Sequence, residues 1–419
     1  MKVHIQTKGI EQMKIIRCAL AILPLFGAST IYAGVINVNC NTGDSLAAAV
    51  SSASRGDHIM ILGNCNEPVV VKVDDLILDG QDMAIIDGAS SFPPGPVLHV
   101  TGARGVTIRN LDVQNGILGV SLSQGAHVTL SEVSLRDQQV MGINAVEKSL
   151  VSLADVEVMS AGVLGVNIAE GSIIKATGAV SVGGSGVFSL NLQDGSVMTA
   201  DKAAITLNKN VFGLHISVGS TAFVNNSTIE ANENSLIGVA VDNGSKLFMF
   251  SSKMEANNNG LDGVDCNINS NVDFDAASAL KANNNGRNGI SLEDTTFNVF
   301  SFFVVPGPRI EVFNNARDGV ILTLGSKFDI GINSQLEVAG NGSNGLSADD
   351  GSTVVLTNST ITGHGLEGKH DTKRDVGDLR LTFGSRASAA GATTVTRTVC
   401  DKSALVRGGL VCDRPFIKS

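Results

Sequence analysis

Acidic side chains recur at fixed places in this chain of 419 residues, with a spacing compatible with general acid–base chemistry. Asp262 and Asp318 each directly precede a glycine that begins a repeated unit. If the units stack as parallel strands, these two carboxylates lie two units apart, or ~10 Å. That separation is near the upper end for the carboxylate pair of an inverting glycosidase. Together with Asp265 and Glu293, on outward positions nearby, they form the candidate catalytic set.

The same units offer candidate ligand-binding groups. Arg287 and Arg317 occupy equivalent positions of adjacent units, where two guanidinium groups can bind one sugar carboxylate. His215 and Asp242 are expected to point outward from the same strand of their units. The simpler alternative is a solvated surface whose acidic and amide residues suit the turns, since charge on a repeat surface usually serves solubility. Both interpretations stay open from the sequence.

The elements that must position these groups repeat along the chain. A glycine followed by an aliphatic residue recurs at intervals of 21 to 30 residues. The recurring glycines are Gly119, Gly142, Gly165, Gly186, Gly213, Gly238, Gly263, Gly289, Gly319 and Gly345. Self-similarity at this period is typical of a solenoid, in which one unit cannot bury its own apolar face and stacks on its neighbours.

Each unit reads as three short strands. The first and third residues after the glycine are apolar and the second faces the other way, which is the period of a strand. A Gly-Ser turn and two further alternating segments follow, with too few residues between them for a helix. Asparagine-rich turns before each glycine predict amide ladders between units. The sequence therefore predicts an all-β, right-handed, single-stranded parallel β-helix. Leucine-rich repeats, the main competitor, have a leucine and asparagine spacing that is absent here.

The ends of the solenoid carry their own signals. Ser45 precedes an alanine-rich apolar run, which predicts an N-terminal capping helix over the first open coil. Cys40 and Cys65 lie one coil length apart, and Cys400 and Cys412 enclose a short loop, so each pair is expected to form a disulfide. Cys266 matches inward positions of neighbouring units and is predicted to be a buried thiol.

The N-terminus resembles an export signal. A short basic start precedes the apolar stretch from Cys18 to Ala28, and small residues follow near Ala33. The predicted organisation is a signal peptide over residues 1–33 with a mature start near Gly34, an N-terminal cap and first coil over 34–65, parallel β-helix coils over 66–366, and last coils with a C-terminal cap over 367–419. We expect a secreted or periplasmic protein with no membrane span, because no later segment reaches 18 apolar residues.

Several phrases of the chain are similar to the secreted right-handed parallel β-helix proteins of the pectin-lyase-like superfamily. The phrases are Leu76-Ile77-Leu78-Asp79-Gly80, Ile85-Ile86-Asp87-Gly88, Val97-Leu98-His99-Val100 and Gly105-Val106-Thr107-Ile108-Arg109-Asn110-Leu111. The resemblance covers roughly residues 35 to 400 and implies a ligand groove along the outer face of one sheet. The fold itself carries lyases, hydrolases, adhesins and binding proteins, so it implies no single activity.

The catalytic motifs of that superfamily do not transfer. Of the polygalacturonase-like pattern, only Asp349-Asp350 and Gly363-His364-Gly365 are present. The chain has no Trp and 4% aromatic residues, whereas glycan clefts commonly use aromatic platforms. No metal-ligating set is evident and no cofactor is predicted, apart from a weak Ca²⁺ site for which an acidic solvated edge is the alternative. The acidic residues of that site are Asp74, Asp75, Asp79, Asp82 and Asp87.

The charge distribution excludes some classes of binding partner. The net charge is −10, and twelve basic residues face twenty-four acidic ones between Gly119 and Leu366. This argues against nucleic acid as a partner and against an anionic membrane. The sequence thus predicts an exported monomer that binds, or serves as a scaffold at, extracellular or cell-surface polysaccharide. A polysaccharide lyase or glycoside hydrolase is the first alternative, and an adhesin-like surface protein is the second.

Overall fold

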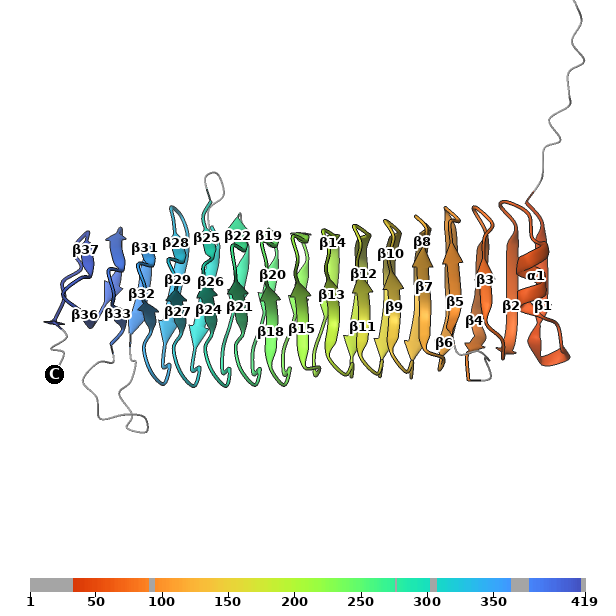
Figure 1. Cartoon of the computed structure of the whole chain (residues 1–419), viewed down its shortest axis with the longest axis horizontal. Coiled ribbons are helices and arrows are strands. Elements are labelled where there is room, and N and C mark those ends of the chain that lie inside the picture. The colour runs from red at the N-terminus through yellow and green to blue at the C-terminus, as the bar shows by residue number, and fades with distance from the viewer. Residues whose placement is uncertain (1–32, 90–94, 276, 302–306, 363–376, 416–419) are drawn as a thin grey trace, which may run out of the picture. The chain divides into compact units, whose positions relative to one another are not determined.

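The computed structural model describes residues 33–89, 95–275, 277–301, 307–362 and 377–415. The expected signal peptide, Cys18 and His364 lie outside the described residues. Successive coils stack along one axis, and every strand pairing between neighbouring coils is parallel (Figure 1). The predicted parallel β-helix is therefore confirmed. None of the helices in the described part of the chain is long and apolar enough to cross a membrane.

One sheet has 15 strands, one from each coil, and its outer face carries the candidate site. Its strands are β3 (Val69–Val71), β5 (Pro96–Thr101), β7 (Leu118–Ser123), β9 (Met141–Ala145), β11 (Leu164–Ile168), β13 (Phe188–Leu192), β15 (Phe212–Ile216), β18 (Ile237–Val241), β21 (Val264–Asn267), β24 (Ile290–Glu293), β27 (Val320–Thr323), β30 (Leu346–Ala348), β33 (Leu379–Leu381), β36 (Thr398–Cys400) and β38 (Arg414–Pro415). The register sets each residue beside its equivalent one coil away, so side chains of one type form rows along the axis.

The other sheet has 23 strands and changes character along the chain. Its strands are β1 (Val35–Asn39), β2 (His58–Cys65), β4 (Ile77–Asp87), β6 (Val106–Gln114), β8 (His127–Arg136), β10 (Leu150–Met159), β12 (Ile173–Gly183), β14 (Val197–Thr206), β16 (Thr221–Asn225), β17 (Thr228–Glu230), β19 (Lys246–Phe250), β20 (Lys253–Glu255), β22 (Asn271–Asp275), β23 (Ala279–Lys281), β25 (Thr296–Val299), β26 (Arg309–Phe313), β28 (Lys327–Ile330), β29 (Gln335–Ala339), β31 (Thr353–Thr357), β32 (Ser359–Thr362), β34 (Arg386–Ala390), β35 (Thr394–Val395) and β37 (Leu405–Arg407). As far as β14, the predicted second and third strands of a coil form one long bent strand; from β16 onward they separate.

The core is a stack of inward-facing aliphatic rows. Ile143, Val166, Leu190, Leu214 and Val239 occupy equivalent positions of successive coils, and all five are buried. Three phenylalanines of later coils stack in the same way, with ring centroids 5.6 and 5.5 Å apart along the row Phe274, Phe297, Phe328. Cys266 is a free, fully buried thiol, as predicted, and burial raises its pKa.

The glycine period has a steric cause. A Cβ on Gly213 would lie 2.5 Å from the carbonyl oxygen of Gly238, and one on Gly238 would lie 2.7 Å from that of Gly263. At these positions a side chain would clash with the neighbouring coil, so glycine is favoured there. Gly186 is a correction to the expected series, because the residue paired into this position is Ser189. Ser189 is 24 residues from both Gly165 and Gly213, so the length of these coils is regular. The irregular intervals of 21 and 27 residues arose from counting Gly186 instead of Ser189.

Buried asparagines join the coils beside these glycines. Each asparagine after the first accepts a hydrogen bond from the backbone N–H of its equivalent in the preceding coil, at 2.9 to 3.0 Å. The row is Asn210, Asn234, Asn259, Asn285, Asn315 and Asn341. The predicted amide ladder is confirmed, and it satisfies polar groups that would otherwise be costly to bury.

The first coil is closed as predicted. Helix α1 (Leu46–Ser52) begins at Ser45, whose hydroxyl accepts from the backbone N–H of Ala48 at 3.1 Å. Leu46 and Val50 are buried in the core. A short 3₁₀ helix, η1 (Cys40–Thr42), precedes α1. The two predicted disulfides, Cys40–Cys65 and Cys400–Cys412, are both present.

Candidate functional site

A row of amide side chains runs along the outer face of the 15-stranded sheet. Asn144, Asn167 and Asn191 occupy the same outward position of β9, β11 and β13. The amide of Asn167 donates to Asn144 and the amide of Asn191 donates to Asn167, both at 2.9 Å. The row is fixed in one orientation and leaves the Asn191 oxygen facing the next coil.

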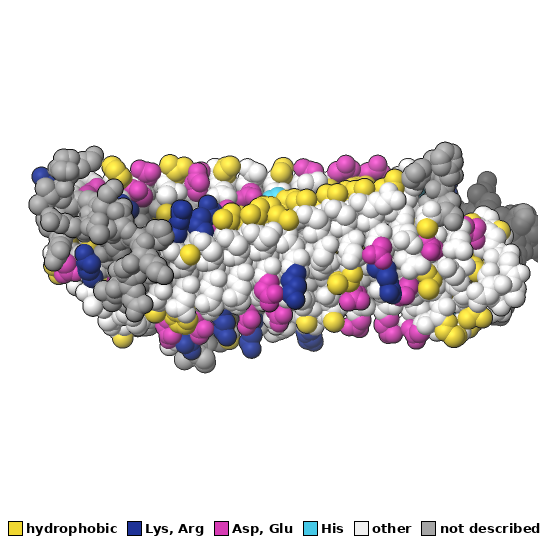
Figure 2. Space-filling model, turned by 90° about the horizontal axis from the view of Figure 1, so that it is seen from below, with side chains coloured by type: hydrophobic (Ala, Val, Ile, Leu, Met, Phe, Trp, Pro, Cys, Tyr) yellow, Lys and Arg dark blue, Asp and Glu magenta, His cyan; other side chains and the backbone are white. Residues whose placement is uncertain are grey.

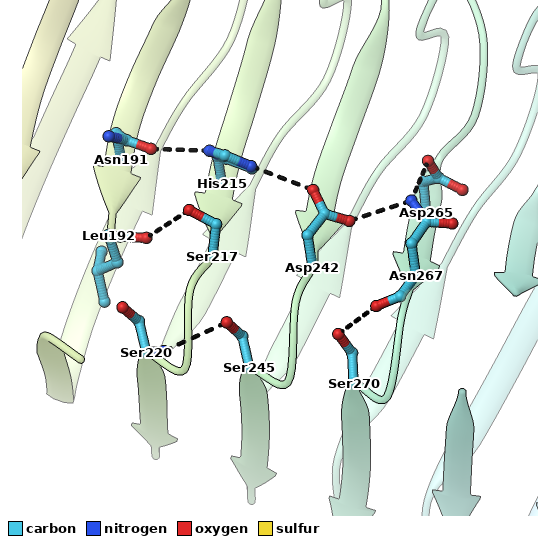
Figure 3. A network of polar contacts seen from close by, with 10 residues as sticks. All are labelled: Asn191, Leu192, His215, Ser217, Ser220, Asp242, Ser245, Asp265, Asn267 and Ser270. Atoms are coloured by element: carbon cyan, nitrogen blue, oxygen red, sulfur yellow. Dashed lines mark hydrogen bonds and ion pairs between the residues drawn. The ribbon is translucent and has the colours of Figure 1, made fainter. Parts of the chain in front are cut away.

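His215 continues the row on β15 (Figure 3). Its Nδ1 lies 2.7 Å from the oxygen of Asn191, and its Nε2 lies 3.1 Å from a carboxylate oxygen of Asp242. Both ring nitrogens therefore face oxygen atoms of neighbouring coils. The ring also stacks on Phe188, with centroids 4.6 Å apart and planes at 11°.

Asn267 links Asp242 to Asp265 (Figure 3). Its amide nitrogen lies 3.0 Å from Asp242 Oδ1 and 3.1 Å from Asp265 Oδ2. Burial raises the pKa of Asp265 to about 6, and the negative charge of Asp262 acts in the same direction. Hydrogen bonds from Asn267 and Ser291 oppose that shift. Asp265 is thus a partly buried carboxyl that changes its charge near pH 6.

Asp262 and Arg287 form a closed pair. The Asp262 carboxylate is completely buried and accepts from Nε of Arg287 at 2.9 Å on each oxygen, and also from Nη2. The backbone N–H of Asn288 donates to it as well, at 2.9 Å. The carboxylate raises the pKa of Arg287. Asp262 therefore fixes a guanidinium one coil away, and both oxygens of its own buried carboxylate are occupied.

Arg317 lies beside Arg287, as expected, and the two turns are joined by a backbone hydrogen bond of 2.7 Å from Arg317 N to Arg287 O. Arg317 is exposed. Asp318 follows it, mostly buried, and accepts from the backbone N–H and the side-chain amide of Asn344, both at 2.8 Å. Burial is the main cause that raises the pKa of Asp318.

The equivalence of Asp262 and Asp318 is confirmed by a ladder of contacts. The backbone N–H of Asn288 binds Asp262, that of Asp318 binds Asn288 at 3.2 Å, and that of Asn344 binds Asp318. These side chains thus stabilise the turns, as the simpler sequence interpretation held. Glu293 ends β24 with an exposed side chain. The structure joins His215, Asp242 and Asp265 in one network and sets Glu293 and Asp318 outside it.

The sequence reasoning missed an apolar row beside the amide row. Backbone hydrogen bonds connect most of its members in successive coils, and Val187 accepts from Phe212, the residue after Val211. The row, which we call the apolar stripe, consists of Ile117, Val140, Val163, Val187, Val211, Leu236 and Leu261. Figure 2 shows a band of hydrophobic side chains that ends at two basic ones, and the next members of the row are Arg287 and Arg317. The stripe is partly exposed, up to 38% at Val163.

Two aromatic rings lie between the apolar stripe and the amide row. Phe188 and Phe212, one residue further along, have ring centroids 4.9 Å apart. Both are half-buried and contact the ring of His215, so they face outward although most phenylalanines were expected in the core. Phenylalanine is a residue type that can form a platform for sugar rings. Whether Phe188 and Phe212 point inward or outward does not follow from the alternation of side chains along a strand.

A concave region lies on the 23-stranded sheet. A groove of about 580 Å³ follows the bend of β4, β6, β8, β10 and β12, lined by Asp82, Asp112, Glu132, Asp155 and Glu157 among others. One of its carboxylates, Asp112, is paired with Arg136 at 2.5 Å. The groove is on a different face from the network of Asp265.

The acidic residues near the N-terminus do not converge. Asp79 is bound by Arg109 at 2.8 Å, Asp75 by Arg55 at 2.7 Å, and Asp87 accepts from Gln114 and Asn115. Over the ranges that the structure describes, no three His, Cys, Asp or Glu side chains are grouped so that they could hold a metal ion. The weak Ca²⁺ site considered from the sequence therefore lacks a ligand set there.

Comparisons with known proteins give a similar architecture at low identity. No protein family and no curated protein matches the sequence. Among solved structures, an alginate lyase from Paenibacillus sp. str. FPU-7 is 13% identical over 66% of this chain and 97% of its own, with a TM-score of 0.41. The active domain of tailspike protein 2 from bacteriophage CBA120 is 11% identical over 73% and 47%, with a TM-score of 0.45. A double mutant of the periplasmic alginate epimerase AlgG is 12% identical over 86% and 84%, with a TM-score of 0.43. Values this low carry no argument about what this chain binds.

Proposed function

We propose that the outer face of the 15-stranded sheet binds a linear polysaccharide laid along the axis of the solenoid. The observation that carries this proposal is the unbroken chain of hydrogen bonds from Asn144 through Asn191, His215 and Asp242 to Asp265. Asn144, His215 and Asp242 are half-buried and expose polar groups along this face. Asn167 and Asn191 are 5% and 4% exposed, so they hold the row in place more than they meet a ligand. Because neighbouring coils are ~4.8 Å apart, a polymer of hydroxylated rings can meet the exposed groups at several coils.

The flanking groups support the same ligand. Phe188 and Phe212 provide aromatic surface beside the amide row, and sugar rings present C–H faces that pack on aromatic rings. Arg317 is exposed near the end of the network and is available to bind a carboxylate. Arg287 is assigned a structural role at this surface and no direct contact with the ligand, because its guanidinium is held by Asp262.

Export is part of the proposal. The Cys40–Cys65 and Cys400–Cys412 disulfides persist in oxidising compartments such as the periplasm or the extracellular space. There the protein would meet polysaccharide directly, as a binding or scaffolding protein at a cell surface.

Catalysis is the second candidate function, and Asp265 is the observation that favours it. A carboxyl with a pKa of about 6 can exchange a proton near physiological pH. It could therefore protonate a glycosidic oxygen in a hydrolase, or remove the proton beside a uronate carboxylate in a lyase. Its partial burial and its neighbour Asp262 are the features that tune carboxyl groups for such work.

A binding experiment with the exported chain tests the first proposal. Calorimetric titration with polygalacturonate, alginate, hyaluronan and a neutral glucan is expected to reveal binding to at least one polymer. Asn191→Ala should weaken it, because the chain of hydrogen bonds is cut at its centre. Asn225→Ala is the matched control, since Asn225 bonds Asp201 at 3.0 Å on the 23-stranded sheet. Equal affinities of both variants for every polymer bound would refute the proposed face.

Product analysis of the same mixtures tests the second candidate. If the chain shortens a polymer, Asp265→Asn should stop turnover while leaving the affinity within a few-fold of the parent. A variant that keeps full turnover removes Asp265 from any catalytic role.

A further inference from the structure

One turn position alternates between apolar and polar residues over seven successive coils. It lies two residues beyond the last inward-facing residue of each strand in the 15-stranded sheet. Its occupants, in order, are Val218, Asn243, Ile268, Asp294, Leu324, Asp350 and Phe383. We call this set the alternating edge. The register of the strands makes these seven positions equivalent, so the apolar residues occur at every second coil.

The backbone at this position disfavours the apolar residues. All seven have a positive φ, between 49° and 53°. Asn and Asp tolerate this left-handed conformation, whereas a β-branched residue such as Val218 or Ile268 rarely adopts it. In the four preceding coils the same position holds Gln124, Glu147, Glu170 and Asp194, all polar. The four preceding coils therefore follow the preference of a left-handed turn for polar residues. Every second coil from Val218 to Phe383 departs from that preference.

Burial does not explain these apolar side chains either. Val218, Ile268 and Leu324 are 51%, 53% and 53% exposed. A residue that strains its backbone and leaves apolar surface in water gains nothing within the folded chain. Backbone outliers of this kind cluster at ligand clamps and other functional sites. The alternation therefore points to a ligand outside the chain.

The alternating edge borders the face proposed to bind polysaccharide. It follows the carboxyl ends of the strands that carry His215 and Asp265, next to Asp242. Along the upper edge of Figure 2, hydrophobic and acidic side chains take turns in the same way. Two coils rise by ~10 Å, which is comparable to the length of a disaccharide. The apolar contacts thus recur with the period of a polymer whose repeating unit has two sugars.

The charges on this edge restrict the chemistry of the repeating unit. Asp294 and Asp350 stand between the apolar members, and Glu293 is exposed one residue before Asp294. A polymer with a carboxylate on every residue would be repelled there. An acetamido group fits both kinds of position, because its methyl group is apolar and its N–H donates to a carboxylate.

We propose that the alternating edge recognises the N-acetyl groups of a polysaccharide in which every second residue is an N-acetylated amino sugar. The inference rests on the proposed function and names its substrate class. The methyl groups pack on Val218, Ile268 and Leu324. The side-chain oxygens of the intervening Asn243, Asp294 and Asp350 accept the amide N–H groups.

Two other occupants fit the edge less well. A lipid surface or a second copy of the chain would require contiguous apolar area, whereas the apolar members here are separated by a polar or acidic coil. Acidic residues along the edge also oppose anionic headgroups. Self-association is nevertheless an outcome that the test must detect.

The test replaces the three apolar residues with the residue of an intervening coil, in the triple variant Val218→Asn, Ile268→Asn and Leu324→Asn. Hyaluronan, which alternates a uronate with an N-acetylated amino sugar, is the first probe, and polygalacturonate, uniform along its length, is the second. We expect the triple variant to bind hyaluronan on the order of tenfold more weakly or worse, with its affinity for polygalacturonate unchanged. Its thermal midpoint should rise, because Asn relieves the left-handed turns.

Glu170→Asn is the matched control, since it changes the same turn position outside the alternating coils and should leave both affinities unchanged. A triple variant that binds hyaluronan as the parent does overturns the inference. So does a parent that binds only polygalacturonate, an outcome that leaves the proposed function standing. A parent that binds none of the polymers overturns both. A change of mass by light scattering between parent and triple variant would assign the edge to self-association instead.

Discussion

The carboxylate of Asp262 has no exposure to solvent and is bound on both oxygens by Nε of Arg287, which projects from the following coil, at 2.9 Å. Two residues chosen from the sequence for separate roles, one catalytic and one ligand-binding, therefore neutralise each other. Their pairing also shapes the site, because the charge of Asp262 contributes to the raised pKa of Asp265.

Removing the guanidinium should destabilise the protein strongly. In Arg287→Met the Asp262 carboxylate stays buried without its charge partner, and breaking a buried pair in this way costs about 3 kcal/mol or more. Urea unfolding followed by circular dichroism measures the loss. Arg317→Met, one coil further and exposed, should cost less than about 0.5 kcal/mol. The double variant Arg287→Met with Asp262→Asn should recover part of the loss; equal stability of Arg287→Met and the parent would contradict the pairing.

The stability of the protein should fall as the pH rises through the titration of Asp265. Its folded pKa, about 6, lies above its ordinary value of 3.8, so the folded state holds the proton more tightly than the unfolded state does. The stabilising contribution is complete below pH ~4 and is lost by pH ~6.5, with a magnitude on the order of 2–3 kcal/mol. The difference in unfolding free energy between the parent and Asp265→Asn isolates it, because the raised pKa of Asp318 acts in both proteins. A difference that does not change between pH 4 and 7 contradicts the assignment.

The period of the glycines was sufficient to predict the coils and the Cys40–Cys65 disulfide, whose cysteines lie one coil length apart. The outward direction of His215 and Asp265 followed from counting along one strand. The direction of Phe188 and Phe212 was not predictable in this way. A Cβ on Gly213 would meet Ala231 and Asn234 inside the coil, and the next residue, Leu214, is also buried. Two consecutive inward positions interrupt the alternation, so the residue before the glycine faces outward.

The ion pair between Asp262 and Arg287 was not predictable for a different reason. Spacing along the sequence placed the two residues on adjacent coils but could not tell whether the long arginine side chain extends outward or folds back over its neighbour. The alternating edge was not predictable from the sequence, because its residues share a positive φ. An apolar residue such as Val218 does not indicate a left-handed turn.

Affinity for an acidic polysaccharide should depend on Arg317 and not on the charge of Arg287. Arg317→Ala is expected to weaken binding to polygalacturonate about tenfold, the value of a charge-assisted hydrogen bond, and to leave binding to a neutral glucan unchanged. Raising the salt concentration should reduce the difference between variant and parent, because an exposed ion pair is screened. Arg309→Ala is a suitable control, since Arg309 pairs with Glu311 and Glu337 on the 23-stranded sheet. If both variants weaken binding equally, the contact with Arg317 is non-specific.

The aromatic surface beside the amide row should contribute to binding in proportion to ring area. Phe188→Leu keeps an apolar side chain but removes the ring that stacks on His215 at 4.6 Å, so we expect a roughly three- to tenfold loss of affinity for any polymer bound, corresponding to about 0.5–1.5 kcal/mol. The stacked pair Phe223 and Phe248, with centroids 5.2 Å apart on the 23-stranded sheet, provides the matched control Phe223→Leu. That variant loses a comparable ring contact on a face that does not meet the ligand, and its affinity should equal that of the parent. Parallel losses in both variants would show that the aromatic rings act through stability alone, whereas a loss confined to Phe188→Leu places the polymer across β13.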